Sequence, residues 1–289
     1  MYDWIQLVIN GLLQGGLYGL IGLGLALMFG VMKLVNIAHG ECMVLAAYGA
    51  WFLFARLPLM GWWLAVPVVL AAAMALGWAV QALLLGPALR SGDPMRPLLI
   101  SFGLSVVLRN LMVELFGADP RSLPGGAMLQ SGFAVGGVTI GVFPLGLLLL
   151  ALLLFLALHL LLRHSRFGRI VRASADRPET VRLMGVSPER AYRWVAALSL
   201  GFAALSGLLL GLRGSFTPFS GAEQLLTAFE VVIIGGLGSL WGAFVGGLAL
   251  GVAQLLGLKL DPNAGALYSH LLFLLILLLY PKGLSGGRA

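Results

Sequence analysis

The chain has few charged residues and a single cysteine. Asp, Glu, Lys and Arg make up 10% of its 289 residues, whereas a soluble domain carries roughly 25%. Hydrophobic residues make up 60%, and the mean hydropathy is +1.00. Cys42 excludes an internal disulfide. A hydrocarbon core of about 30 Å needs roughly 20 apolar residues for each helical crossing. The composition therefore predicts an all-α fold, a polytopic membrane helical bundle.

The sequence also lacks the common motifs of nucleotide hydrolysis and of hydrolytic enzymes. Its only lysines are Lys33, Lys259 and Lys282, and none follows the glycines of a phosphate-binding loop. There is no G-x-S-x-G, no H-E-x-x-H and no Cys/His cluster. We therefore expect a protein that is not an enzyme and that holds no catalytic residue, metal or cofactor of its own.

The sequence contains eight apolar runs. They lie at about 5–31, 42–56, 62–86, 97–117, 143–162, 194–212, 226–257 and 266–280. The run at 226–257 is either one tilted helix, or a short half-helix followed by a full crossing, because glycines interrupt it. We expect about eight or nine crossings in a single transmembrane domain, residues 1–289. The Gly-rich segment 118–142 is predicted to be a loop.

Glycine is abundant inside the apolar runs. The chain has 41 glycines, and seven of them lie in the first run. Small residues let helix backbones approach closely in lipid, so the bundle is expected to be tightly packed and to contain broken helices. Leu17–Leu27 also resembles Leu240–Leu250. This similarity indicates either an internal repeat, as transporters often have, or chance in a Gly/Leu-rich chain.

Positive charge is concentrated in one loop. Eight of the 18 Lys and Arg residues lie between residues 163 and 193. Basic loops stay on the cytosolic side of a membrane. The segment at about 163–193 is therefore predicted to be a cytosolic loop.

Helix-capping patterns divide this loop. Asp176 and Glu179 have the spacing of a capping box, and Gly185 is typical of the residue after a helix end. Ser187 followed by Pro188 predicts a second helix start. Short helices are unstable alone in water. The loop therefore either docks on a cytosolic partner or is a solvated segment that only sets topology.

A polar group separates the first two apolar runs. It contains Asn36, His39 and Glu41. Polar and ionisable groups are costly in a bilayer unless they face water, protein or each other. The group is either an interfacial turn or a helix break that lines the transport route or locks two helices together.

A second polar position is Glu230, inside the run at 226–257. This carboxyl group either lies at the membrane edge or is buried in a protonated or paired form. Gly235, Gly236 and Gly238 follow it and can unwind the helix towards a cavity. From polarity, the candidate pathway residues are Asn36, His39, Glu41, Glu230, Gly235, Gly236 and Gly238.

Four other ionisable residues lie in or near apolar runs. We expect Arg109 and Glu114 to be interfacial or paired, and His159 and His270 to be ordinary helix residues.

Three segments together resemble the LivH-type permease subunit of branched-chain amino acid ABC transporters. They are the Asn-Ile-Ala-His-Gly-Glu of 36–41, similar to the family's N-F-A-H-G-E, the loop 168–186, and the Gly-Gly-Leu-Gly-Ser of 235–239 with the glycines after it. Their order and spacing agree with the family from about residue 5 to 283. Trp241 stands where Pro is more common, and the resemblance assigns no role to Glu230.

The resemblance implies an importer made of several subunits. It implies a second permease subunit of the same superfamily, two cytosolic ABC ATPase subunits that use the ATP, and a periplasmic substrate-binding protein that delivers a small amino acid, with no nucleic acid. It implies a multi-pass protein of the bacterial inner membrane. The ATPase-coupling loop would contain Arg169, Arg172, Ala173, Asp176, Glu179, Arg182, Leu183, Gly185 and Val186. The alternatives are the same architecture importing urea or short amides, or a self-contained secondary carrier or channel.

Overall fold

The computed structural model describes residues 2–57, 61–126, 129, 131–262 and 264–285. They form two compact units. The first unit comprises 1–26, 125–158 and 227–289, and the second comprises 27–124 and 159–226.

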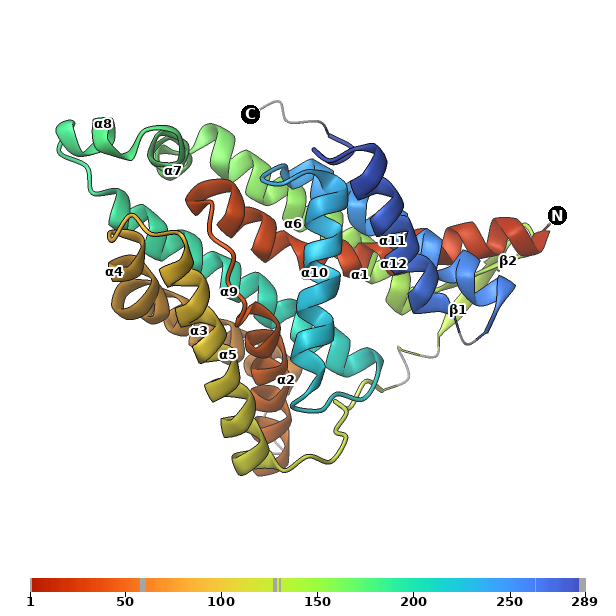
Figure 1. The fold of residues 1–289 in the computed structure, drawn as a ribbon. Helices are drawn as coiled ribbons and strands as arrows, with labels where there is room; N and C mark the ends of the chain where they lie inside the picture. The colour runs from red at the N-terminus through yellow and green to blue at the C-terminus, as the bar shows by residue number, and fades with distance from the viewer. Residues whose placement is uncertain (1, 58–60, 127–128, 130, 263, 286–289) are drawn as a thin grey trace. The chain divides into compact units, whose positions relative to one another are not determined.

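Helices make up most of the described residues, as predicted (Figure 1). In chain order they are α1 (Tyr2–Met32), α2 (His39–Arg56), α3 (Trp62–Val80), the π-helical turn η1 (Gln81–Leu85), α4 (Gly86–Leu89), α5 (Met95–Phe116), α6 (Val142–His164), α7 (Arg166–Asp176), α8 (Pro178–Leu183), α9 (Pro188–Arg213), α10 (Ser220–Gly235), α11 (Leu240–Leu260) and α12 (Gly265–Leu279).

The predicted loop at 118–142 contains a small antiparallel hairpin. It consists of β1 (Gly132–Val135) and β2 (Val138–Gly141). Gly136 and Gly137 connect the strands with φ of +59° and +85°. A two-residue hairpin turn favours positive φ at both positions, which glycine adopts without strain. The hairpin does not change the all-α class of the fold.

The number of crossings is not confirmed as eight or nine. In the described part of the chain, six helical segments are long and apolar enough to span a bilayer. They are Trp4–Met32, Trp62–Leu89, Met95–Phe116, Val142–His164, Pro188–Arg213 and Leu240–Leu260. Two further apolar helices, α12 and α2, are not among these six segments. α12 has only 15 residues, and α2 carries His39, Glu41 and Arg56 near its ends.

The run at 226–257 is broken, so a single tilted helix there is wrong. α10 ends at Gly235 and α11 begins at Leu240. Between them Gly236 and Gly238 have φ of +99° and +88°, a conformation that favours glycine. The Ser239 hydroxyl then accepts a hydrogen bond from the Gly242 N–H at 3.0 Å and caps α11.

Glycines bring α1 and α11 close together in the first unit. A Cβ on Gly11 would lie 2.7 Å from the Cα of Val252, and one on Gly251 would lie 2.7 Å from the Cα of Gly15. Residues 11, 15 and 19 repeat at helical spacing, which places them on one face of α1. The predicted tight packing is confirmed. The internal repeat stays a prediction.

The second unit is built around α9, which packs against α2 and α3. The Gly207 position on α9 faces the backbone of Met43 on α2, and Gly77 on α3 faces the backbone of Ala196 on α9. Tyr48 lies in the adjoining core, with its ring 4.7 Å from that of Phe116, centroid to centroid.

α5 shows how polar and apolar residues are distributed in this unit. Its buried stripe includes Ser101 and Ser105, whereas Leu99, Val107 and Leu115 are exposed. Exposed leucine and buried serine along one helix is the reverse of a water-soluble pattern. It fits a helix whose outer face meets lipid and whose inner face meets protein.

We predict that Gly207→Ala destabilises the second unit by about 1–3 kcal/mol, because the added methyl group overlaps the Met43 backbone. Gly103→Ala on α5 is the matched control, since a Cβ there has no heavy atom within 4 Å. Thermal unfolding in detergent should show a lower Tm for the first variant and an unchanged or higher Tm for the control. Equal Tm values would contradict the close contact.

Candidate functional site

The predicted cytosolic loop consists of two short helices and the start of α9. α7 carries Arg169, Arg172, Ala173 and Asp176, all of them exposed. α8 carries Glu179, Arg182 and Leu183, also exposed, and Gly185 and Val186 connect α8 to α9. Every residue predicted for coupling therefore lies in the second unit and within one continuous segment.

α7 is held on α9 by one face. The Ser165 hydroxyl caps α7 by accepting a hydrogen bond from the Gly168 N–H at 2.8 Å. Val171 and Ser174 are buried. The Tyr192 hydroxyl on α9 donates to the Ser174 carbonyl at 2.8 Å. This arrangement leaves the arginine-bearing face of α7 open.

The capping box predicted at Asp176 and Glu179 is wrong. Asp176 is the last residue of α7, and the N-cap of α8 is Arg177, with φ of −144° and no side-chain cap bond. The reason is Pro178. Proline has no N–H and disfavours helical geometry in the residue before it, so it ends α7 and occupies the first position of α8.

Two other predictions about this loop are confirmed. Gly185 follows the end of α8 with φ of +76°, as a residue after a helix end should. Ser187 is the N-cap before Pro188, although its side chain makes no cap hydrogen bond. The helix that begins there is the 26-residue α9. The loop is therefore joined directly to the central helix of the second unit.

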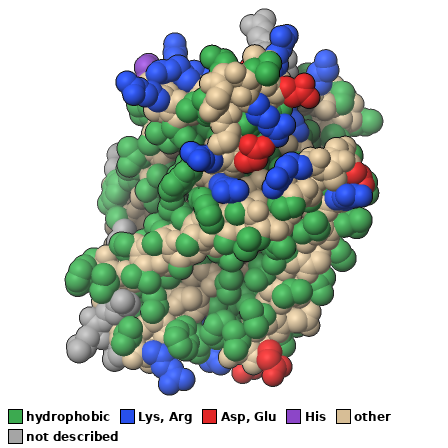
Figure 2. All heavy atoms as spheres, turned by 90° about the vertical axis from the view of Figure 1, so that its left-hand side faces the viewer, with side chains coloured by type: hydrophobic (Ala, Val, Ile, Leu, Met, Phe, Trp, Pro, Cys, Tyr) green, Lys and Arg blue, Asp and Glu red, His purple; other side chains and the backbone are tan. Residues whose placement is uncertain are grey.

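The tip of α8 combines exposed apolar side chains with an ion pair. Leu183 and Met184 are 89% and 77% exposed. Arg182 donates to Glu189 at the start of α9, with a separation of 2.6 Å. Figure 2 shows most Lys and Arg side chains of the face it draws in its upper part, with mainly hydrophobic side chains below them and a few charged side chains at the bottom. Exposed apolar residues next to a group of cations suit a protein partner.

The polar group before α2 forms a buried network, also in the second unit. The Asn36 side-chain oxygen accepts from the Ala38 N–H at 3.1 Å, and the Ile37 N–H donates to Ser101 on α5 at 3.1 Å. His39 is fully buried at the start of α2. The burial of these side chains within the protein favours a helix break or a helix lock over an interfacial turn.

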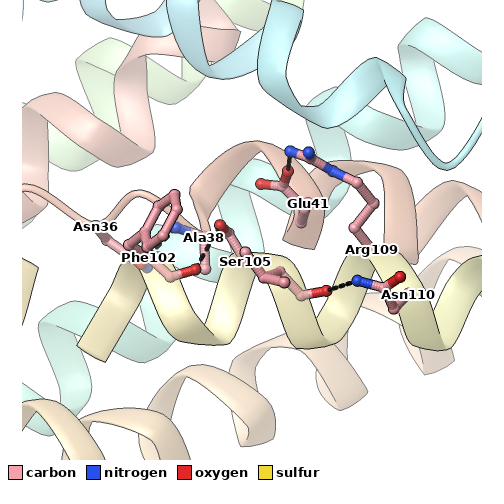
Figure 3. A network of polar contacts seen from close by, with 8 residues as sticks. Asn36, Ala38, Glu41, Phe102, Ser105, Arg109 and Asn110 are labelled. Carbon is pink, nitrogen blue, oxygen red and sulfur yellow. Dashed lines mark hydrogen bonds and ion pairs between the residues drawn. The ribbon is translucent and has the colours of Figure 1, made fainter. Parts of the chain in front are cut away.

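Glu41 is the anion of this network. Its side chain is 1% exposed, and one carboxylate oxygen lies 2.5 Å from a terminal guanidinium nitrogen of Arg109 on α5 (Figure 3). The pair joins two helices, which agrees with the predicted helix lock. The prediction that Arg109 is paired is thus confirmed, and its partner is Glu41. Spacing could not identify this partner because it lies 68 residues away.

Glu230 and its glycines lie in the first unit, separate from the Asn36 group. The Glu230 side chain is 2% exposed and pairs with His270 on α12. The paired alternative for Glu230 is therefore confirmed. The expectation that His270 is an ordinary helix residue is wrong, because a carboxylate 40 positions away reaches it through the packing of α10 and α12.

The glycine break after α10 is held by the C-terminal segment. The Leu284 N–H donates to the Ile234 carbonyl at 2.8 Å, and the Ser285 hydroxyl donates to the Gly235 carbonyl at 2.5 Å. These contacts satisfy carbonyls at the end of α10. Within the described ranges, no group of three His, Cys, Asp or Glu side chains could hold a metal ion.

Known proteins are similar to this chain in sequence over nearly its whole length. Residues 7–280 match the model of the family described as branched-chain amino acid transport system, permease component. The high-affinity branched-chain amino acid transport system permease protein LivH of Escherichia coli (strain K12) is 29% identical, over 98% of this chain and 96% of that protein. LivH of Salmonella typhimurium is 30% identical over the same shares. BraD of Pseudomonas aeruginosa is 29% identical over 99% of this chain and 97% of its own length. No solved structure matches.

We predict an asymmetry between the partners of the helix lock. Arg109→Gln leaves the buried Glu41 carboxylate without its cation and should cost about 3 kcal/mol of stability. Glu41→Gln leaves a guanidinium that is 33% exposed and so less deeply buried than the carboxylate, and it should cost less. The double variant should be no less stable than Arg109→Gln alone. Denaturant or thermal unfolding in detergent measures all three, and a larger loss in Glu41→Gln would contradict the assignment.

Proposed function

Because the chain belongs to the family of branched-chain amino acid transport permeases, we propose that it is the non-enzymatic permease subunit of an ATP-binding-cassette importer. In this proposal, the multi-pass protein lies in the bacterial inner membrane and forms the translocation pathway with a second permease subunit. Two cytosolic ATPase subunits supply the energy, and a periplasmic protein delivers a branched-chain amino acid. The chain itself uses no cofactor.

One observation carries the assignment of a cytosolic partner. Leu183 and Met184, at the tip of α8, are almost fully exposed in a loop that is rich in arginine. A loop that served only to set topology would need a few basic residues, and it would gain nothing from two exposed apolar side chains at the end of a short helix. An apolar groove on an ATPase subunit would bury them.

The second unit offers a route by which movement of α8 could reach the membrane. Arg182 links α8 to Glu189 on α9. α9 meets α2 where Gly207 packs on the Met43 backbone, and α2 carries Glu41, which Arg109 ties to α5. Closure of the ATPase pair would pull α8, and these contacts would transmit the tilt to α2 and α5. The polar residues His39 and Glu41 then lie on a helix that moves, and Asn36 lies directly before it.

The substrate class rests on what the relatives are named for, which is branched-chain amino acid transport. The test is uptake in liposomes that contain the purified permease pair, its ATPase subunits and the binding protein. Leucine, isoleucine or valine should accumulate only with ATP, and urea and short amides should not compete. Transport by this chain alone would instead identify a self-contained carrier.

For the coupling surface, we predict that Leu183→Asp with Met184→Asp reduces ATP-driven uptake at least tenfold, because the charges prevent burial in an apolar groove. Membrane insertion should be unchanged, since both side chains are exposed and pack on no other helix. Met95→Asp, at an exposed methionine outside the loop, is the control and should retain uptake. Co-purification of the ATPase should follow uptake. Normal uptake by the double variant would exclude the tip of α8 from coupling.

A further inference from the structure

A cavity of about 560 Å³ lies in the second unit, and the loop forms part of its wall. Its walls come from η1 and α4, from α8, and from the first turns of α9. Three arginines and one acidic residue line it: Arg90, Arg182, Arg193 and Glu189. The proposed coupling route uses the Arg182–Glu189 pair of this cavity but assigns no role to Arg90 or Arg193.

The charges in the cavity do not balance. Glu189 is already bonded to Arg182 at 2.6 Å, so Arg90 and Arg193 are in excess. The guanidinium of Arg193 lies over the ring of Trp78, 5.3 Å from its centroid. This contact holds the cation in place and leaves its hydrogen-bond donors available. A planar guanidinium presents paired donors that match the oxygens of a phosphate.

The backbone near Arg90 makes room for a ligand. The π-helical turn η1 closes where the Gly86 N–H donates to the Gln81 carbonyl, and such turns often mark functional sites. Gly86 and Gly92 both line the cavity. A Cβ on Gly86 would lie 2.5 Å from the Gln81 carbonyl oxygen, so glycine there permits the π-helical turn. A Cβ on Gly92 would have no heavy atom within 4 Å, so a group can approach the main chain there.

The surroundings of the cavity identify the kind of anion. Trp78 is exposed, and so are Leu83 and Leu84 on η1. Tryptophan favours the membrane interface, and exposed leucines meet acyl chains. Basic pockets between helices on the cytosolic side attract anionic headgroups. A cationic cavity next to exposed apolar residues can hold a phosphate and its lipid tails together.

We propose that this cavity binds an anionic phospholipid of the cytosolic leaflet, with its phosphate against Arg90 and Arg193 and its acyl chains along Leu83 and Leu84. The proposal concerns this chain in any membrane and does not depend on the importer assignment.

The test is native mass spectrometry of the purified full chain in detergent, titrated with dioleoylphosphatidylglycerol or with dioleoylphosphatidylcholine. The first phosphatidylglycerol should bind clearly more tightly than phosphatidylcholine. Each arginine near a membrane surface contributes about a fivefold gain in affinity, so Arg90→Gln with Arg193→Gln should weaken that first binding about thirtyfold. Arg163→Gln with Arg166→Gln removes the same charge from exposed positions outside the cavity and should change it less than twofold.

Two further measurements keep the proposal falsifiable. Arg90→Lys retains the charge but loses the paired donors, so it should weaken the binding less than Arg90→Gln does. Inorganic phosphate at millimolar concentration should not displace the lipid, because it has no acyl chains. Equal weakening in both double variants would show adventitious binding to any basic surface. Displacement by inorganic phosphate would show a free-anion site. Either result would overturn the lipid assignment.

Discussion

Close approach of helix backbones is the contact on which the second unit depends. In lipid, apolar side chains gain nothing by leaving an equally apolar solvent, so association relies on packing at short range. Gly207 on α9 and Gly77 on α3 allow this close packing, because each faces the backbone of the neighbouring helix with no side chain between. α9 therefore has α2 on one side and α3 on another. Since α9 starts at Pro188, directly after the loop, α8 is connected to the packed centre of the unit.

Ion pairs between helices add specificity to this packing. In the second unit Arg109 reaches Glu41, and in the first unit His270 reaches Glu230. In each pair the acid is buried and the base is more exposed. Burying a carboxylate is tolerable only with such a partner, so each pair favours one arrangement of its helices over others. The pairs therefore act as locks that a conformational change would have to keep or exchange.

Much of the fold could be predicted from composition and apolar runs, because helix length follows from bilayer thickness. Local signals also identified Gly185 and the Ser187–Pro188 helix start. The cap predicted at Asp176 was wrong because Pro178 determines the helix boundary. Its steric effect on the preceding residue is stronger than the preference expressed by a capping pattern. The partners of Glu41 and Glu230 were not predictable, since residues 68 and 40 positions apart meet only through tertiary packing. The number of crossings stayed open because α2 mixes charged ends with an apolar middle.

The Arg182–Glu189 pair connects the two proposals, because it lies between the tip of α8 and the basic cavity. Glu189 can satisfy Arg182 only while α8 stays close to α9. A phospholipid phosphate beside Arg90 and Arg193 would neutralise the excess positive charge that otherwise competes for the same carboxylate. The lipid would then favour the docked position of α8, the position from which Leu183 and Met184 project into water. A movement of α8 away from α9 would have to break the Arg182–Glu189 pair and, at the same time, expose the bound phosphate. Lipid composition would in that case alter the cost of coupling without any contact with the transported molecule.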